Sequence, residues 1–256
     1  MPEACFRFYA SLNDFLLPQQ RQVSFHRQLK ERGSVKDAIE ALGVPHPEVA
    51  LILANSEPVD FSYLVGDGDR ISVYPAFTKL DTASLSNLRS PLLEVRFILD
   101  IHLGKLATYL RLLGFDTLYR NDYQDQELAE IASREGRVLL TRDRGLLKRS
   151  IVTYGYCVRQ DRTEDQLPEV LWRFDLWEKI CPFQRCLRCN SLTEPVAKAA
   201  IDSRLPPKTR RYYHNFRLCP TCDRIYWPGS HHQRLQAFIE KLLEQVATAG
   251  SNMKNS

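Results

Sequence analysis

Alternating apolar and polar residues along the first 78 positions predict a small domain of strands around one helix. The predicted strands are a first one around Phe6 and Phe8 and three more at 23–25, 49–54 and 71–74. The helix is expected to begin after Ser34, because Ser34 and Asp37 have capping-box spacing, and to end at Gly43. The order of two strands, a helix and two strands is typical of a β-grasp fold.

Apolar runs of strand length alternate with helical spacing between residues 94 and 180. Strands are predicted at 94–99, 115–119, 138–141 and 156–158, and helices at 103–113, 127–135, 146–147 and 163–174. Such alternation predicts an α/β domain whose mainly parallel sheet carries helices on both faces. Residues 79–93, rich in Thr, Ser and Asn, are predicted to be the linker between the two domains.

Positive charge is concentrated in the last third of the chain, although the net charge of the 256 residues is only +4. Residues 181–256 contain twelve Lys and Arg against five Asp and Glu. A cationic region favours a polyanionic partner, with nucleic acid as the first candidate, while a solvated basic surface is the alternative. No apolar run reaches the length of a bilayer helix and no secretory pattern opens the chain, so we expect a cytoplasmic protein.

Acidic residues follow three of the strands predicted in the second domain. Asp100 ends the first strand, Asp122 and Asp125 follow the second with Glu127 nearby, and Asp143 follows the third. The carboxyl ends of parallel strands meet at one edge of a sheet, where converging carboxylates need a cation to offset their repulsion. Hard oxygen ligands suit Mg²⁺ or Mn²⁺, and such ions support phosphodiester hydrolysis.

Each acid also has a simpler interpretation as a helix cap or a solvated loop residue. This applies above all to Asp125, which precedes Gln126 near the predicted start of a helix. Asp100 and Asp143 fit it less well, because both end strongly apolar strands. Three cations close to the acids in sequence are candidate phosphate ligands: Lys105, Arg142 and Arg144.

Three stretches of the second domain resemble the Mut-seven C-terminal RNase family, a PIN-like nuclease family with a trailing zinc ribbon. They are FILDIHLGKLATYLRLLGFDT from Phe97, Asn121-Asp122, and EGRVLLTRDRGLL from Glu135. The resemblance spans about residues 94–232 and implies a metal-dependent RNase with a PIN-like domain over 94–180. It also implies that the metal is held by Asp100, Asp143 and an intermediate acid, for which Asp122 and Asp125 are favoured over Glu127.

The first domain resembles the ubiquitin-like sulfur carriers of thiamine and molybdopterin synthesis, chiefly in its length and in the ending GDGDRISVYP at 66–75. Those carriers act through a free C-terminal Gly-Gly, whereas this chain continues through 76–78 without such a pair. We therefore expect a binding or scaffolding module that contacts a protein partner. Many members of the nuclease family carry such an N-terminal ubiquitin-like domain.

Two C-x-x-C pairs in the last third predict a four-cysteine zinc site formed by Cys186, Cys189, Cys219 and Cys222. Four thiolates leave no open coordination position, so the zinc is expected to be structural. The 29 residues between the pairs exceed the usual interval of a zinc ribbon. A long hairpin or arm containing Pro206 and Pro207 is expected to bridge them within a ribbon over 181–232.

Cations and aromatic residues alternate around the second cysteine pair, a mixture that suits RNA. Arg210 and Arg211 are candidate phosphate ligands, while Phe216 and Trp227 are interpreted as the small core of the ribbon. An amphipathic helix is predicted at 233–246, with a disordered tail to residue 256.

The first functional hypothesis is a metal-dependent RNase. The alternatives are a non-catalytic RNA-binding or ribosome-associated adaptor and a protein–protein scaffold.

Overall fold

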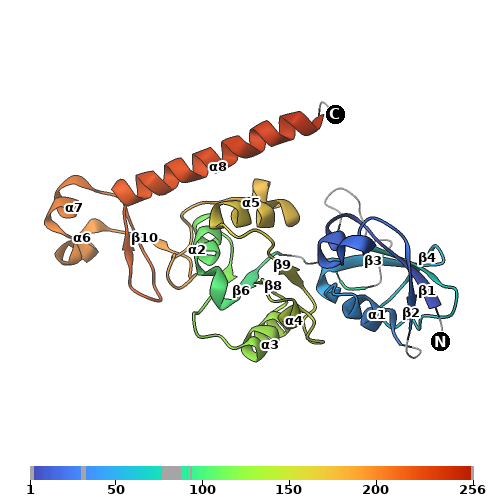
Figure 1. Ribbon diagram of the computed structural model, residues 1–256. Helices are drawn as coiled ribbons and strands as arrows, with labels where there is room; N and C mark the ends of the chain where they lie inside the picture. The colour runs from blue at the N-terminus through green and yellow to red at the C-terminus, as the bar shows by residue number, and fades with distance from the viewer. Residues whose placement is uncertain (1–2, 30–32, 77–87, 91, 93, 255–256) are drawn as a thin grey trace.

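The computed structural model describes residues 3–29, 33–76, 88–90, 92 and 94–254. It contains an N-terminal mixed sheet, a central parallel sheet flanked by helices, and a four-cysteine region that ends in a long helix (Figure 1). These parts confirm the predicted fold class. Most of the linker predicted at 79–93 lies outside the described residues.

The N-terminal sheet has five strands in the order β2-β1-β5-β3-β4. Its strands are β1 (Glu3–Phe8), β2 (Phe25–Gln28), β3 (Val49–Ala54), β4 (Glu57–Val59) and β5 (Arg70–Pro75). Strand β1 pairs with β5 in parallel, and the other pairs are antiparallel, which is the β-grasp arrangement. Helix α1 (Val35–Ala41) begins after Ser34, whose side chain accepts a hydrogen bond from the Asp37 amide, so the predicted cap is confirmed.

Short 3₁₀ helices complete this domain: η1 (Ala10–Phe15), η2 (Pro18–Gln20) and η3 (His46–Glu48). The prediction placed the second strand at 23–25, whereas β2 begins at Phe25. The short strand β4 was not predicted, because Pro58 removes a backbone donor and the segment has little apolar alternation. Pro58 is tolerated there because β4 is at the edge of the sheet.

The central sheet has four parallel strands in the order β7-β6-β8-β9. They are β6 (Phe97–Leu99), β7 (Thr117–Leu118), β8 (Val138–Thr141) and β9 (Gly155–Cys157). All residues of β6, β8 and β9 are buried. Burial on both faces explains why these strands are continuously apolar in sequence rather than alternating.

Helices cover both faces of this sheet, as predicted (Figure 1). They are α2 (Gly104–Leu112), α3 (Asp125–Glu135), α4 (Arg144–Leu147) and α5 (Thr163–Arg173), with 3₁₀ turns η4 (Ile101–Leu103) and η5 (Trp177–Lys179). Phe97 and Leu99 of β6 pack in one cluster with α2 and α5. Ile98, between them, packs in a second cluster with α3 and α4, so neighbouring residues of one strand serve opposite layers.

The structure shows how two helices of this domain begin. The N-cap of α5 is Arg162, whose side chain makes no capping hydrogen bond, although Thr163 and Gln166 have the spacing of a capping box. Gln166 instead points to the preceding loop and donates to the Gln160 carbonyl at 2.9 Å. Asp125 is the first residue of α3 and not its cap, which places a negative charge in the first turn, where the helix dipole favours it.

The four-cysteine region contains a three-stranded sheet, β10-β11-β12. Its elements are β10 (Glu194–Val196), α6 (Lys198–Ile201), η6 (Asp202–Arg204), α7 (Pro207–Tyr212), β11 (Phe216–Leu218) and β12 (Ile225–Tyr226). The expected arm between the cysteine pairs is therefore a pair of short helices joined to β10, at one end of the molecule (Figure 1). Pro207 suits the start of α7, because a first-turn residue needs no amide donor.

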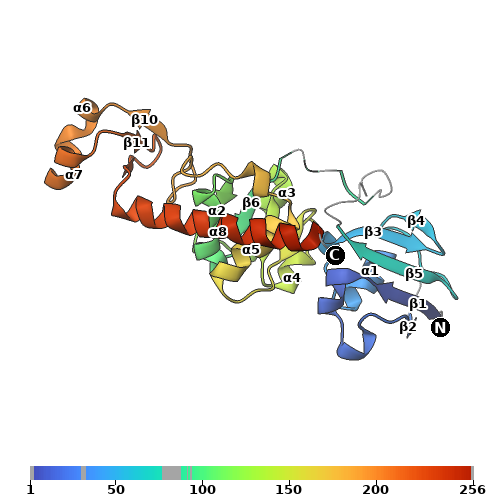
Figure 2. The same ribbon diagram turned by 90° about the horizontal axis from the view of Figure 1, so that it is seen from above.

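The last helix, α8 (Ser230–Lys254), runs back from the four-cysteine region along α2 and α5 (Figure 2). Ile239 and Leu242 are buried in the same cluster as those helices, and Phe238 stacks on Tyr109 with ring centroids 4.7 Å apart. The disordered tail predicted after residue 246 is wrong up to Lys254, since the helix continues through it.

The N-terminal domain packs directly on the central domain. The buried Glu48 accepts a hydrogen bond from the Cys157 amide at 2.6 Å, and His46 Nε2 lies 2.7 Å from the Val152 carbonyl oxygen. Lys148 Nζ donates to the Glu40 carbonyl at 2.7 Å. One continuous apolar cluster joins the β-grasp core to α3 and α4. In the described part of the chain, no helix has the length and apolar character needed to cross a membrane.

Candidate active site and metal centre

Asp100 and Asp143 flank the point where the strand order of the central sheet reverses. The chain moves outward from β6 to β7 on one side, and from β8 to β9 on the other, so β6 and β8 are neighbours. Open parallel sheets bind ligands at the carboxyl ends of the strands beside such a switch point. Asp100 directly follows β6, and Asp143 follows β8. The fold therefore places the two strongest candidate acids at its preferred ligand site.

The hydroxyl of Thr141 joins these two acids. Thr141 Oγ1 donates to Asp100 Oδ2 at 2.7 Å and accepts a hydrogen bond from the Asp143 backbone amide at 2.9 Å. Thr141 is fully buried and Asp100 is 6% exposed, so this link is shielded from water. The Asp100 amide also donates to the Leu140 carbonyl at 3.0 Å, which holds the end of β6 against β8.

Asp143 is also the N-cap of α4, contrary to the expectation that it was poorly suited to capping. Its Oδ1 accepts hydrogen bonds from the amides of Gly145 at 2.6 Å and Leu146 at 3.4 Å. Capping uses one carboxylate oxygen and orients the group. Among the described residues, no hydrogen bond reaches Asp143 Oδ2 or Asp100 Oδ1, so each carboxylate keeps one oxygen for another ligand.

The intermediate acids lie at the surface and are paired with arginines. Arg120 donates to both carboxylate oxygens of Asp122, at 2.9 and 3.0 Å, and to Glu127 at 3.1 Å. This pairing lowers the pKa of Asp122. Asp125 lies 4.0 Å from Arg149. In the part of the chain that the structure describes, no three acids have carboxylate oxygens within 4.8 Å of one another, so the structure joins Asp100 to Asp143 but not to a third acid.

A polar cavity of about 330 Å³ opens at the same edge of the sheet. The predicted phosphate ligands Lys105 and Arg142 line it, together with His102 from η4 and Asp161 after β9. Arg142 forms an ion pair with Asp161. His102 and Asp161 were not predicted, because nothing in their local sequence indicates that η4 and the loop after β9 face one another.

The other predicted phosphate ligands do not line this cavity. Arg144 is the first residue of α4, next to Asp143, and its guanidinium carbon lies 4.9 Å from the centre of the Phe15 ring of the N-terminal domain. Arg210 and Arg211 belong to α7, remote from the central sheet (Figure 1). Arg210 pairs with Asp202 at 3.3 Å, while Arg211 lies 5.5 Å from the ring of the exposed Tyr212.

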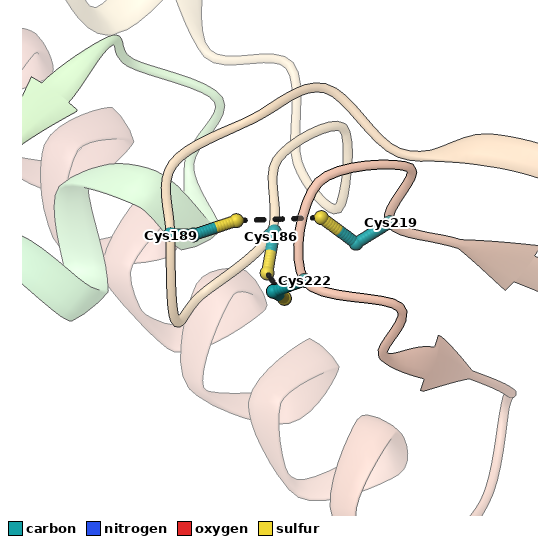
Figure 3. Close-up of side chains that lie close together, drawn as sticks. All are labelled: Cys186, Cys189, Cys219 and Cys222. Carbon is teal, nitrogen blue, oxygen red and sulfur yellow. Dashed lines mark hydrogen bonds between the residues drawn. The ribbon is translucent and has the colours of Figure 1, made fainter.

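Four cysteine side chains from two loops converge (Figure 3). The four Sγ atoms of Cys186, Cys189, Cys219 and Cys222 lie within 4.8 Å of one another, with Cys186–Cys222 at 3.4 Å and Cys189–Cys219 at 3.3 Å. A tetrahedral site with bonds of about 2.3 Å has sulfur–sulfur edges of roughly 3.8 Å, so the cluster has the right size for one metal ion.

The thiols of this cluster differ in acidity. Burial raises the pKa of Cys189, but hydrogen bonds with Ser191 and the Cys219 thiol outweigh it and lower the pKa to about 6. Burial and hydrogen bonds with the other thiols raise the pKa of Cys222 to about 12. Four adjacent thiols do not all ionise unless a cation offsets the repulsion between thiolates, which is the condition that a bound divalent metal meets.

The first cysteine loop is tied to the central domain. Arg111 of α2 is 4% exposed and donates to the carbonyls of Arg188 at 2.9 Å and Thr117 at 2.9 Å. Asn190 accepts from the Thr117 amide and donates to Asp116, both at 2.9 Å. The cysteine loop is thus part of the packing of α2 and β7, a role of Arg111 that its place on a helix did not reveal.

The region around β11 has a small core, as predicted. Phe216 is 4% exposed and packs with Ile201 and Leu205, with Trp227 partly buried against them.

Comparison with known families gave two matches: the Mut7-C RNAse domain over residues 95–239 and the Mut7-C ubiquitin domain over residues 1–81. The first match alone covers more than half of the chain. No curated protein and no solved structure matched.

Proposed function

From the premise that this chain belongs to the family of the Mut7-C RNAse domain, we propose that it is a metal-dependent ribonuclease. The proposed reaction is hydrolysis of RNA phosphodiester bonds at the carboxyl edge of the central sheet, with Asp100 and Asp143 as the principal metal ligands and Mg²⁺ or Mn²⁺ as the ion. The observation that carries the proposal is the Thr141 hydroxyl, which holds both acids beside the switch point.

The donor set fits a hard cation. Asp100 and Asp143 each retain a carboxylate oxygen without a hydrogen bond from the described residues, and carboxylate oxygens are the ligands that Mg²⁺ and Mn²⁺ prefer. Asp122 or Asp125 would supply a further carboxylate, which for Asp122 requires release from Arg120. A bound ion would supply activation of water and stabilisation of the charge that develops on the phosphate.

The chain's own cations would position the RNA. Lys105 and Arg142 line the cavity formed by residues that follow β6, β8 and β9, where they are suited to hold phosphates of the strand. Arg210 and Arg211 of α7 would contact RNA at a distance from the site of cleavage, which suits a long single strand or a structured RNA. The four cysteines would hold a structural zinc ion that stabilises this region, because four thiolates leave no position for substrate.

The test compares cleavage of labelled single-stranded and structured RNAs by the wild type and by Asp100→Asn and Asp143→Asn, with Mg²⁺, Mn²⁺ or EDTA. Loss of an outer-shell partner of a metal ligand typically costs 10- to 100-fold, so each variant is expected to lose at least about a hundredfold in cleavage rate. Glu130→Gln is the matched control, because Glu130 is an exposed acid of α3 that bonds only Gln126 among the described residues.

A non-catalytic RNA-binding adaptor is the second candidate. The pairing of Asp122 and Glu127 with Arg120 favours it, since these acids are engaged and do not converge with Asp100 and Asp143. RNA binding without cleavage under every metal condition, unchanged by both aspartate substitutions, would replace the nuclease proposal with this one.

A further inference from the structure

Two arginines at the carboxyl edge of the central sheet lie on one aromatic ring of the N-terminal domain. Arg144 follows Asp143, and Arg159 follows β9. The guanidinium carbon of each is 4.9 Å from the centre of the Phe15 ring, at the end of η1. Phe15 is only 6% exposed, so its ring is fixed by the core of its own domain.

Arg159 attaches η1 to the central sheet. Its Nε lies 3.1 Å from Asp14 and its Nη2 3.3 Å from the fully buried Glu48, both in the N-terminal domain. Its guanidinium also lies 4.8 Å from the centre of the Tyr156 ring. With two carboxylates and two rings around it, the charge of Arg159 is neutralised within the protein.

Arg144 is different. It is exposed, and no carboxylate of the described residues lies within ion-pair distance of it. Its contacts are the Phe15 ring and a long hydrogen bond of 3.5 Å to the Phe15 carbonyl. By contrast, Arg142 pairs with Asp161, and Arg149 with Asp125. The positive charge next to Asp143 is therefore held in place without being offset.

We propose that the N-terminal domain contributes to RNA binding by the nuclease. In this proposal Phe15 positions the Arg144 guanidinium to bind an RNA phosphate adjacent to the one that is cleaved. This rests on the proposed ribonuclease function. Phe15 is a positioning residue and touches no substrate. The aromatic ring restricts a long, flexible side chain before RNA arrives, so less conformational entropy is lost on binding.

The test is a double-mutant cycle in the full-length protein with Phe15→Leu, Arg144→Gln and both together. Phe15→Leu keeps apolar volume but removes the ring, and Phe15→Tyr restores a ring. Binding of a labelled single-stranded RNA is measured at several salt concentrations with Ca²⁺ replacing Mg²⁺, and cleavage is measured with Mg²⁺. Thermal unfolding verifies that each variant is folded.

Arg144→Gln is expected to reduce the dependence of log K on log salt by about 0.7, the value for one phosphate contact with a single strand. Phe15→Leu is expected to weaken RNA binding about threefold and to raise KM with kcat unchanged, a loss of the size of one exposed cation–π contact. Phe15→Tyr should bind as the wild type does. In the Arg144→Gln background, Phe15→Leu should have no further effect.

Arg134→Gln is the charge control, because Arg134 is an exposed arginine of α3 whose ion pair is with Glu135. It is expected to leave the salt dependence unchanged. An equal effect of Phe15→Leu with and without Arg144, or a wild-type salt dependence for Arg144→Gln, would overturn the proposal. If the wild type binds but does not cleave RNA, the ribonuclease function fails while the binding cycle still decides the role of Phe15.

Discussion

Thr141 illustrates how an uncharged residue can organise the candidate site. Its hydroxyl both donates to Asp100 and accepts from the amide of Asp143, so one side chain sets the relation between two strand ends. The two aspartates were predicted from sequence because each ends an apolar strand. Thr141 was not predicted as part of the site, since a β-branched residue at the end of a strand is ordinary in any sheet.

Replacing Thr141 with Val should therefore impair catalysis more than folding. Valine matches the shape of threonine but removes the hydroxyl, so Asp100 loses a donor and the Asp143 amide loses an acceptor. We expect a 10- to 100-fold loss of RNA cleavage and a loss of about 1–3 kcal/mol in the free energy of unfolding. Steady-state kinetics and denaturant unfolding measure the two effects.

Thr141→Ser is the matched control for this prediction. Serine retains the hydroxyl and is expected to keep most of the cleavage activity. If Thr141→Val cleaves RNA as fast as Thr141→Ser, the hydroxyl has no part in holding the acids.

At the scale of elements, the first cysteine loop and the start of the central domain form one unit. Arg111 of α2 donates to the carbonyl of Arg188, and Asn190 accepts from the amide of Thr117 in β7. The cysteine spacing alone predicted a metal site in a separate ribbon. It did not predict the attachment, because Arg111 is a single buried cation whose partners are backbone carbonyls distant in sequence.

If the four cysteines hold the proposed zinc ion, its removal is expected to increase local opening of β7 as well as of the cysteine loop. Without the ion, the thiols repel one another when ionised, and the loop loses the geometry that presents Asn190. Hydrogen exchange with and without a chelator should show faster exchange of the amides of 186–190 and of Thr117. The amides of β3 serve as the internal control and should keep their protection.

If Thr117 retained its protection while the cysteine loop exchanged freely, the two elements would be independent.

The C-terminal end of α8 differs from the sequence prediction. Its C-terminal segment was predicted to be disordered because of its Ser, Asn and Lys content, yet the backbone is helical to Lys254. Helix formation is cooperative, so a helix anchored by Ile239 and Leu242 extends into residues that would not begin one.

At the scale of the whole molecule, the N-terminal and central domains share a buried polar contact. Glu48 is fully buried, accepts from the Cys157 amide and pairs with Arg159. The apolar cluster around α1 continues into α3 and α4. A ubiquitin-like domain joined by a linker suggests an independent module, but these contacts indicate that the two domains fold against one another.

Glu48→Gln should therefore destabilise both domains together. Glutamine retains an acceptor for the Cys157 amide but removes the charge that pairs with Arg159, so we expect a loss of roughly 2–3 kcal/mol in the free energy of unfolding. Denaturant unfolding followed by far-UV circular dichroism measures it. Glu57→Gln, at an exposed position of β4, is the control and should change stability by less than about 0.5 kcal/mol.

A stability equal to the wild type, or two separate unfolding transitions, would show that the domains are energetically independent.

The sequence was enough to predict three features of the N-terminal domain: its resemblance to ubiquitin-like proteins, the order of its elements and the lack of a Gly-Gly pair at its end. The surface by which this domain meets the central domain was not predicted, because Phe15, Glu48 and Arg159 have no local pattern that distinguishes them from ordinary core or surface residues.

The sequence by itself determined the elements and the ligand types. Apolar periodicity located the strands and helices of both domains, Ser34 and Asp37 marked one helix start, and the C-x-x-C pairs marked the four-cysteine cluster, since each of these signals is local along the chain. Only the tertiary structure decided which strands are neighbours, and so which acids meet. Packing of distant segments placed β6 beside β8, left Asp122 with Arg120, and brought Phe15 to Arg144.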